Sequence, residues 1–291
     1  MTVPHPAGDE VVEGDLVELT VGAPAHGGHC VARIGGAHGR VVFVRHALPG
    51  ERITAQITEL HKGYLRADAV TVHEASPDRV APPCPYAHPG GCGGCDLQHV
   101  RDSAQLDWKT AVVREQLTRL GGLPADEIER LGVRVERLPG GLLGWRSRVR
   151  YAVDAADRAG LLRHRSHQVV PIDHCRIAHP AIQRQDVTRR PWPGTDAVEV
   201  VASTGGDVTV LARAAATDLA PTDEPGDAAE VLSGPADVRE VAAGRDWHVP
   251  AHGFWQVHPA AADTLVEAVV TLLAPAPGEV SWDLYGGAGL F

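Results

Sequence analysis

The cysteines carry the most specific chemistry in this sequence of 291 residues. Cys84, Cys92 and Cys95 form a Cys-x7-Cys-x2-Cys run, and Cys30 and Cys175 are the other two cysteines. Most residues between the three are Gly or Pro, which permit the bends and close backbone approach that several sulfurs around one centre require. We therefore predict a thiolate-ligated centre with Cys175 as its fourth ligand.

The spacing leaves the identity of the metal open. Four-cysteine sites with a Cys-x2-Cys limb hold zinc as well as iron–sulfur clusters. A disulfide framework is disfavoured, because the cysteine count is odd and no secretory signal is recognisable at the start of the sequence. Cys30 lies in an alternating apolar run, and we expect it to be a small core residue.

Charge is unevenly distributed along the chain. The net charge of −10 disfavours attraction of nucleic acid to the molecule as a whole. Residues 134–190 nevertheless contain twelve arginines against five acidic residues, whereas residues 191–250 contain three against eleven. Arg146, Arg148 and Arg150 alternate along one expected strand, and we predict that they bind the phosphates of a nucleic acid; a solvated surface is the alternative. No apolar run approaches the ~18 residues of a membrane span, so we expect a cytoplasmic protein without membrane contact.

Hydrophobic periodicity divides the chain into regions. After a disordered tail at 1–12, short strands at 16–21, 30–34, 40–44, 52–57 and 64–70 predict a small closed barrel. A helix is expected at 103–120, capped by Ser103, with Leu106, Val113, Leu117 and Leu120 on its apolar face. A β-rich region follows, with strands at 146–153 and from 161, a hairpin joining 198–201 to 208–211, and an exposed loop at 221–236.

The last forty residues predict a different kind of structure. A helix is expected at 259–273, followed by a strand at 280–284 that runs into a glycine-rich turn. A strand that ends in glycines is typical of nucleotide sites in open α/β sheets. Taken alone, the turn fits a nicotinamide or flavin site, or a tight turn without a ligand.

Several motifs together resemble one family. They are Cys84-Pro-Tyr with Gly-Gly-Cys92-Gly-Gly-Cys95-Asp-Leu-Gln-His99, Ala47-Leu-Pro-Gly-Glu-Arg52, the segment 170–177 around Cys175, Gly253-Phe-Trp-Gln256-Val, and Trp282-Asp-Leu-Tyr285-Gly-Gly287-Ala-Gly289. In this order they resemble the TRAM-containing uracil-C5 RNA methyltransferases, which use S-adenosylmethionine. The resemblance implies a multidomain fold: a TRAM-like, OB-like RNA-binding β-barrel at 13–75, a central α+β, β-rich iron–sulfur domain at 76–250, and the start of a Rossmann-like methyltransferase domain at 251–291. The helix at 103–120 is expected to pack on the last of these.

The same resemblance implies the ligands and their residues. A 4Fe-4S cluster would be held by Cys84, Cys92, Cys95 and Cys175, with zinc as the alternative. S-adenosylmethionine would be contacted by Gln256, Tyr285, Gly287 and Gly289. The expected function is uracil-C5 methylation of RNA, ribosomal rather than transfer RNA, by a monomer.

In the family, a cysteine attacks C6 of uracil and an acidic residue removes the C5 proton. No matching positions were found up to Phe291, so the resemblance implies an incomplete catalytic domain, with both residues beyond Phe291 and this chain inactive alone. Two other functions remain open. One is a non-catalytic, metal-stabilised RNA-binding protein; the other is an iron–sulfur oxidoreductase that uses the glycine turn for a dinucleotide.

Overall fold

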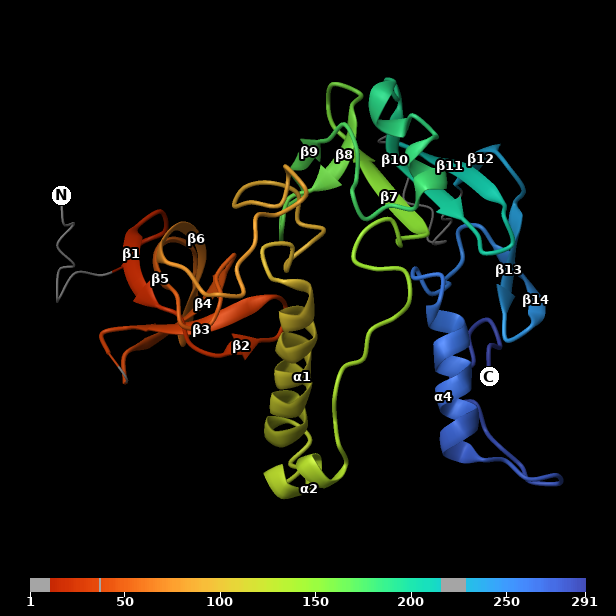
Figure 1. The fold of residues 1–291 in the computed structure, drawn as a ribbon. Coiled ribbons are helices and arrows are strands. Elements are labelled where there is room, and N and C mark those ends of the chain that lie inside the picture. Colours follow the sequence, from red (N-terminus) through yellow and green to blue (C-terminus); the bar gives the residue numbers. More distant parts are fainter. Residues whose placement is uncertain (1–10, 37, 216–228) are drawn as a thin grey trace. The chain divides into compact units, whose positions relative to one another are not determined.

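Figure 1 shows the fold as a computed structural model, which describes residues 11–36, 38–215 and 229–291. The chain divides into two compact units, Met1–Arg137 and Leu138–Phe291, and each is described here by itself. No helix among the described residues is both long and apolar enough to span a membrane. Of the tail expected at 1–12, residues 1–10 lie outside the described residues.

The first unit is built around a β-barrel. Its strands are β1 (Leu16–Thr20), β2 (Pro24–Ala25), β3 (His29–Ile34), β4 (Arg40–Arg45), β5 (Arg52–Leu60) and β6 (Tyr64–Glu74). They form one sheet in the order β1-β5-β6-β4-β3-β2. The sheet closes because the chain leaving β1 also bonds to β3: Gly22 N–H donates to the Val31 carbonyl at 2.7 Å, and Val31 N–H donates to that of Ala23 at 2.9 Å.

The barrel core follows the alternation of apolar residues that predicted the strands. In β5, Ile53, Ala55 and Ile57 point inward, and each is at most 1% exposed. Cys30 is fully buried in the same core, and its thiol faces the Ala47 carbonyl at 3.6 Å. Burial also raises the pKa of the Cys30 thiol. The prediction that Cys30 is a core residue is confirmed.

Helix α1 (Asp102–Arg119) forms where the sequence predicts a helix, but it uses a different face. Arg101, not Ser103, is the N-cap, and no side chain caps the helix. Ala104 and Trp108 join the barrel core, so the helix packs on the barrel through them. Packing of the same helix on the C-terminal domain stays a prediction. Leu120 is 81% exposed. The predicted apolar face is therefore wrong, because the large ring of Trp108 buries more apolar surface than that row of aliphatic residues. The short helix α2 (Ala125–Arg130) follows.

The second unit contains a six-stranded sheet and a separate hairpin. The sheet has the order β12-β11-β10-β7-β8-β9 and the hairpin is β13-β14. The elements are β7 (Arg148–Val153), β8 (Ala159–Leu162), β9 (Val169–Pro171), α3 (Pro180–Gln183), the 3-10 helix η1 (Val187–Arg189), β10 (Thr195–Ala202), β11 (Val208–Ala214), β12 (Glu230–Ser233), β13 (Asp237–Ala242), β14 (Arg245–Pro250) and α4 (Ala261–Leu273).

Sequence patterns locate most, but not all, of these strands. The predicted hairpin is confirmed, because Val198–Val201 of β10 pairs in register with residues 209–212 of β11. The hairpin β13-β14 was not predicted, and β12 lies inside the segment expected to be a loop; residues 221–228 of that loop are outside the described residues.

The C-terminal segment differs from the expectation of a helix followed by a strand. Helix α4 forms, with Leu265 39% and Leu272 85% exposed. Residues 280–284 are not a strand, so that prediction is wrong for this structure. A strand requires a neighbour to accept its backbone hydrogen bonds, and no described residue pairs with this segment.

Candidate functional site

The cysteine loop, residues 84–99, lies between the barrel and α1 in the sequence and is made of successive turns. Ala87 N–H donates to the Cys84 carbonyl at 3.1 Å, and Gly91 N–H donates to that of His88 at 3.0 Å. The backbone N–H of Gly94 donates to Cys92 Sγ at 3.3 Å. All three thiols are half-buried. The glycines thus allow backbone to approach sulfur, as the sequence predicts.

Two residues of this loop, Asp96 and His99, anchor it on the barrel. Asp96, which follows the third cysteine, accepts a hydrogen bond from Arg45 at 2.8 Å, and the Arg45 side chain is only 7% exposed. Gly28 packs against Asp96 so closely that a Cβ at position 28 would lie 2.3 Å from the Asp96 Cβ. His99, which ends the loop, is 4% exposed and faces the Ala47 carbonyl at 3.5 Å. The barrel therefore fixes the part of the loop that follows the third cysteine.

Cys175 lies in the second unit. It is 8% exposed, in the turn after β9, and its carbonyl accepts from Ala178 N–H at 3.1 Å. Its neighbour Tyr151 has a pKa raised first by burial and then by the Cys175 thiolate charge. Among the described residues, no group of three or more His, Cys, Asp or Glu side chains is positioned to hold a metal ion. The predicted ligands thus belong to two units: three lie on one loop of the first unit, and Cys175 lies in the second.

The residues predicted to contact the cofactor lie on two segments of the second unit. Gln256 is half-buried. The residue before it, Trp255, is 5% exposed, and the carbonyl of the residue after it, Val257, accepts a hydrogen bond from Ser147 N–H at 2.8 Å. The Trp145 ring stacks on the His258 ring, with 5.7 Å between the ring centroids, and burial lowers the pKa of that histidine. The segment around Gln256 is therefore fixed by contacts of the residues that precede and follow Gln256 in the sequence.

The glycine turn is the second of these segments. Tyr285 is fully exposed with φ of 65°, and Gly287 and Gly289 also have positive φ, of 56° and 74°. Gly289 N–H closes the turn on the Gly286 carbonyl at 2.8 Å. Leu290 packs against the cluster that contains Trp255, so the end of the turn and the residue beside Gln256 share one hydrophobic cluster.

The three arginines predicted to bind RNA have different environments. Arg148 is 12% exposed; it donates to the carbonyls of Ala251 and Gly253 at 2.9 Å and pairs with the buried Glu240 at 3.1 Å. Arg146 precedes β7, and its Nε donates to the Arg148 carbonyl at 3.1 Å. Arg150 is 56% exposed and lies 3.5 Å from Glu199. Arg148 therefore ties the β13-β14 hairpin region to β7, and Arg150 is the one of the three that solvent reaches most.

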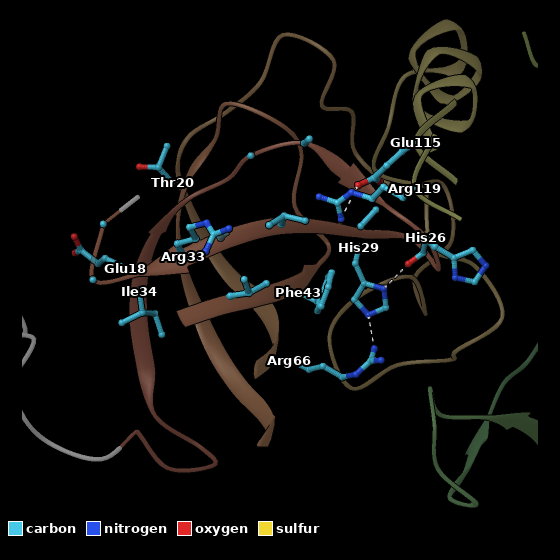
Figure 2. A pocket seen from close by; sticks show the side chains of 18 of the residues that line it. Glu18, Thr20, His26, His29, Arg33, Ile34, Phe43, Arg66, Glu115 and Arg119 are labelled. Carbon is cyan, nitrogen blue, oxygen red and sulfur yellow. Dashed lines mark hydrogen bonds and ion pairs between the residues drawn. The ribbon is translucent and has the colours of Figure 1, made fainter. Parts of the chain in front are cut away.

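A groove of about 970 Å³ lies on the first unit, between the barrel and α1 (Figure 2). Its lining includes His29, Arg33, Phe43 and Arg66 from the barrel and Arg119 from the helix. The sequence analysis missed this groove. The alternation of apolar residues in the strands at 40–44 and 64–70 could have predicted part of it, because it places Phe43 and Arg66 on the outer face of the barrel.

The comparisons with known proteins identify the family. Residues 10–70 match the TRAM domain family. A protein of Streptomyces avermitilis, named an uncharacterized RNA methyltransferase, is 48% identical over 96% of this chain and 68% of its own length. The chain belongs to the TRAM-domain RNA methyltransferases. A Streptomyces coelicolor relative of the same name is 46% identical over 96% of this chain and 65% of its own length. The chain thus spans about two thirds of the length of these RNA methyltransferases.

A solved structure shares the fold of this RNA methyltransferase chain. The crystal structure of the Pyrococcus abyssi tRNA (uracil-54, C5)-methyltransferase in complex with S-adenosyl-L-homocysteine matches with a TM-score of 0.61 and 21% identity. The match covers 94% of this chain and 69% of that chain. The likeness shows a common fold, and it agrees with the multidomain, sheet-rich architecture expected from the sequence.

Proposed function

We propose that this chain belongs to an S-adenosylmethionine-dependent uracil-C5 methyltransferase that acts on RNA. The fold likeness to a uracil-C5 methyltransferase over 94% of the chain carries the proposal, and membership of the RNA methyltransferase family supports it. Gln256, Tyr285, Gly287 and Gly289 are the proposed cofactor contacts. The hydrophobic cluster that Leu290 shares with Trp255 supports their lying near one another.

The proposed reaction needs a thiolate nucleophile and a base. A cysteine thiolate would add to uracil C6, which makes C5 nucleophilic. C5 would then take the methyl group of S-adenosylmethionine, with S-adenosylhomocysteine as the leaving group, and a base would remove the C5 proton, so that the sulfur–C6 bond breaks and the thiolate is released. Cys30 is fully enclosed in the barrel core, and its raised pKa disfavours the thiolate. We assign neither the nucleophile nor the base to any residue of this chain.

The other four cysteines are proposed to bind a 4Fe-4S cluster. The donor chemistry fits such a group, because Cys84, Cys92 and Cys95 share one loop and a backbone N–H already points at one of the sulfurs. Cys175 would complete the set from the second unit. The cluster would act as a structural clamp rather than an electron relay, and thiolates committed to it are unavailable as nucleophiles.

Metal analysis tests this ligand set. Anaerobic purification should yield about four irons and four sulfides per chain, with loss of iron when Cys84 or Cys175 is changed to Ser. Stoichiometric zinc without iron under the same conditions would replace the cluster by a zinc site. Full iron retention in the Cys175→Ser variant would remove Cys175 from the set.

A methylation assay tests the proposed activity. The Streptomyces avermitilis relative and this chain are each incubated with labelled S-adenosylmethionine and uridine-containing fragments of ribosomal and transfer RNA. We expect the relative to form C5-methyluridine, on ribosomal RNA in preference to transfer RNA, and this chain to form none. Product from this chain would place the nucleophile within residues 1–291, and product from neither protein would refute the proposed chemistry.

A further inference from the structure

We propose that the groove between the barrel and α1 binds a single-stranded segment of RNA, with a base against Phe43 and phosphates at Arg33 and Arg119 (Figure 2). This inference deepens the proposed function and rests on it, because it names the surface of this RNA methyltransferase chain that takes the RNA. The family resemblance already implies that the barrel binds RNA, together with the arginine-rich segment of the second unit. The inference assigns the face of the barrel and the residues that would contact the RNA.

Strand register gathers the groove's aromatic and basic side chains on one face. Val31 of β3, Phe43 of β4 and Arg66 of β6 are direct neighbours across the three strands. The next outward row, two residues along each strand, contains Arg33 and Tyr64. Because side chains two residues apart share a face, rings and guanidinium groups alternate there.

Phe43 is held as a fixed ring that remains half-exposed. Its centroid lies 5.3 Å from that of Tyr64 and 6.3 Å from that of His29, both in edge-to-face geometry at 80° and 81°. These contacts restrict the ring without enclosing it. Single-stranded RNA is bound largely by stacking unpaired bases on such rings.

Arg66 is positioned in advance beside this ring. It donates to His29 Nε2 at 3.1 Å, so the His29 proton lies on Nδ1, which donates to the His26 carbonyl at 3.3 Å. Glu59 lies 3.3 Å from the Arg66 Nε, and the Arg66 side chain is 16% exposed. These two partners, His29 and Glu59, thus hold the Arg66 guanidinium in the lining of the groove, and little order has to be gained on binding.

The outer arginines have weak partners that phosphate can replace. Arg119 is 75% exposed and lies 3.3 Å from Glu115 within the same helix. Surface pairs of this kind contribute little to stability. Arg33 is exposed, and its guanidinium donates to the Gly39 carbonyl at 2.9 Å. With Arg66, the groove has three arginines against Glu18 and Glu115, although the whole chain carries −10.

The test measures binding of the 291-residue chain to a fluorescent, uridine-rich RNA of about twelve nucleotides. Phe43→Leu should weaken binding about tenfold without changing its salt dependence, because it removes stacking but no charge. Phe43→Tyr should restore binding. Arg33→Glu and Arg119→Glu should each weaken binding and reduce the slope of log affinity against log salt by about 0.7.

Matched controls separate the groove from general surface effects. Arg130→Glu is the control for Arg119→Glu. Arg130 is 72% exposed and pairs with Glu127 of its own helix at 3.3 Å, as Arg119 does with Glu115, but it lies outside the groove. Leu60→Ala changes an apolar residue of β5 that is 47% exposed and also outside the groove. Both should bind RNA like the unchanged chain, and circular dichroism should show every variant folded.

Three results would overturn the inference, each in a different way. If the groove variants bind as tightly as the unchanged chain, the groove is not the RNA surface, although the proposed function stands. If uridine monophosphate competes as well as the oligonucleotide, the groove is a nucleotide site. If the unchanged chain binds no RNA, both the groove assignment and this chain's part in RNA recognition fail, whereas methylation by the Streptomyces avermitilis relative is judged separately.

Discussion

Glu51 has no exposed surface, yet it is fully partnered within the barrel unit. Arg79 donates to both its carboxylate oxygens, at 2.5 and 2.6 Å, and the N–H groups of Leu48 and Ser76 donate to it as well. Burial opposes ionisation of Glu51, but these hydrogen bonds outweigh it and lower its pKa. The residue ties the turn before β5 to the segment that leads into the cysteine loop.

Replacing Glu51 with Gln should destabilise the first unit by about 3 kcal/mol, because the partly buried Arg79 guanidinium loses its charged partner. The free energy of unfolding in urea measures this change. Arg52→Ala is the control: its pair with Glu74 is exposed, so about 0–1 kcal/mol is expected. Since the Glu51 pKa is lowered, its stabilisation is present above pH 4.5 and is lost as pH falls further. A Glu51→Gln variant as stable as the unchanged chain would contradict this account.

His99 should affect stability in a separate pH range. Burial, assisted by the charge of Arg79, lowers its pKa from 6.5 to about 4. Between these values the unfolded chain binds the proton and the folded chain does not, so stability falls as pH drops from 6.5 to 4, by about 3 kcal/mol in total.

Urea unfolding as a function of pH tests this prediction. His99→Gln should flatten the stability profile between pH 6.5 and 4, whereas His73→Gln, at an exposed residue of β6, should leave it unchanged. Equal slopes in the His99→Gln variant and the unchanged chain would show that His99 does not cause the loss.

At the scale of elements, the cysteine loop owes its position to the barrel rather than to its own turns. Arg45 holds Asp96, Gly28 packs against the same residue, and His99 is buried below the turn at Ala47. The loop has no regular secondary structure from which to gain rigidity. The positions of its cysteines therefore depend on contacts made in and beside β3 and β4. Metal binding should be lost when those contacts are removed.

Gly28→Ala tests this dependence. A Cβ there would overlap Asp96, so the loop should move, metal content should fall several-fold, and Cys92 and Cys95 should react faster with a thiol reagent. Gly14→Ala is matched, because both glycines have positive φ, 75° and 95°, but nothing lies within 4 Å of a Cβ at position 14. Equal metal content and thiol reactivity in the two variants would show that the Asp96 contact does not position the loop.

At the scale of the whole molecule, each unit has its own candidate RNA surface. The first has the groove at Phe43 and Arg119, and the second has the arginine-rich stretch in which Arg150 is exposed. Because the chain as a whole is acidic, neither surface benefits from the net charge, and local contacts must supply the affinity.

If one RNA uses both surfaces, losses in binding free energy should add. We expect Arg119→Glu and Arg150→Glu each to weaken binding several-fold, and the double variant to show the product of the two factors. The measurement is anisotropy with an RNA long enough to contact both units. A double variant that binds no more weakly than Arg119→Glu alone would confine RNA to the groove.

Local sequence pattern by itself determined the barrel strands, the β10-β11 hairpin, the core position of Cys30 and the existence of both long helices. It also placed three cysteines on one turn-rich loop. Period-2 and helical repeats, turn residues and short-range spacing act between neighbours in the chain, so they can be read without the fold. The strand expected at 280–284 failed because a strand also needs a partner that its own sequence does not supply.

Tertiary structure alone decided which residues of each element meet others far away. It placed Trp108 rather than Leu120 in the barrel core, and it paired Arg148 with the buried Glu240. It also assembled the groove from β3, β4, β6 and α1. Such contacts depend on strand order and helix docking, which join segments distant in the sequence, and no local pattern encodes them.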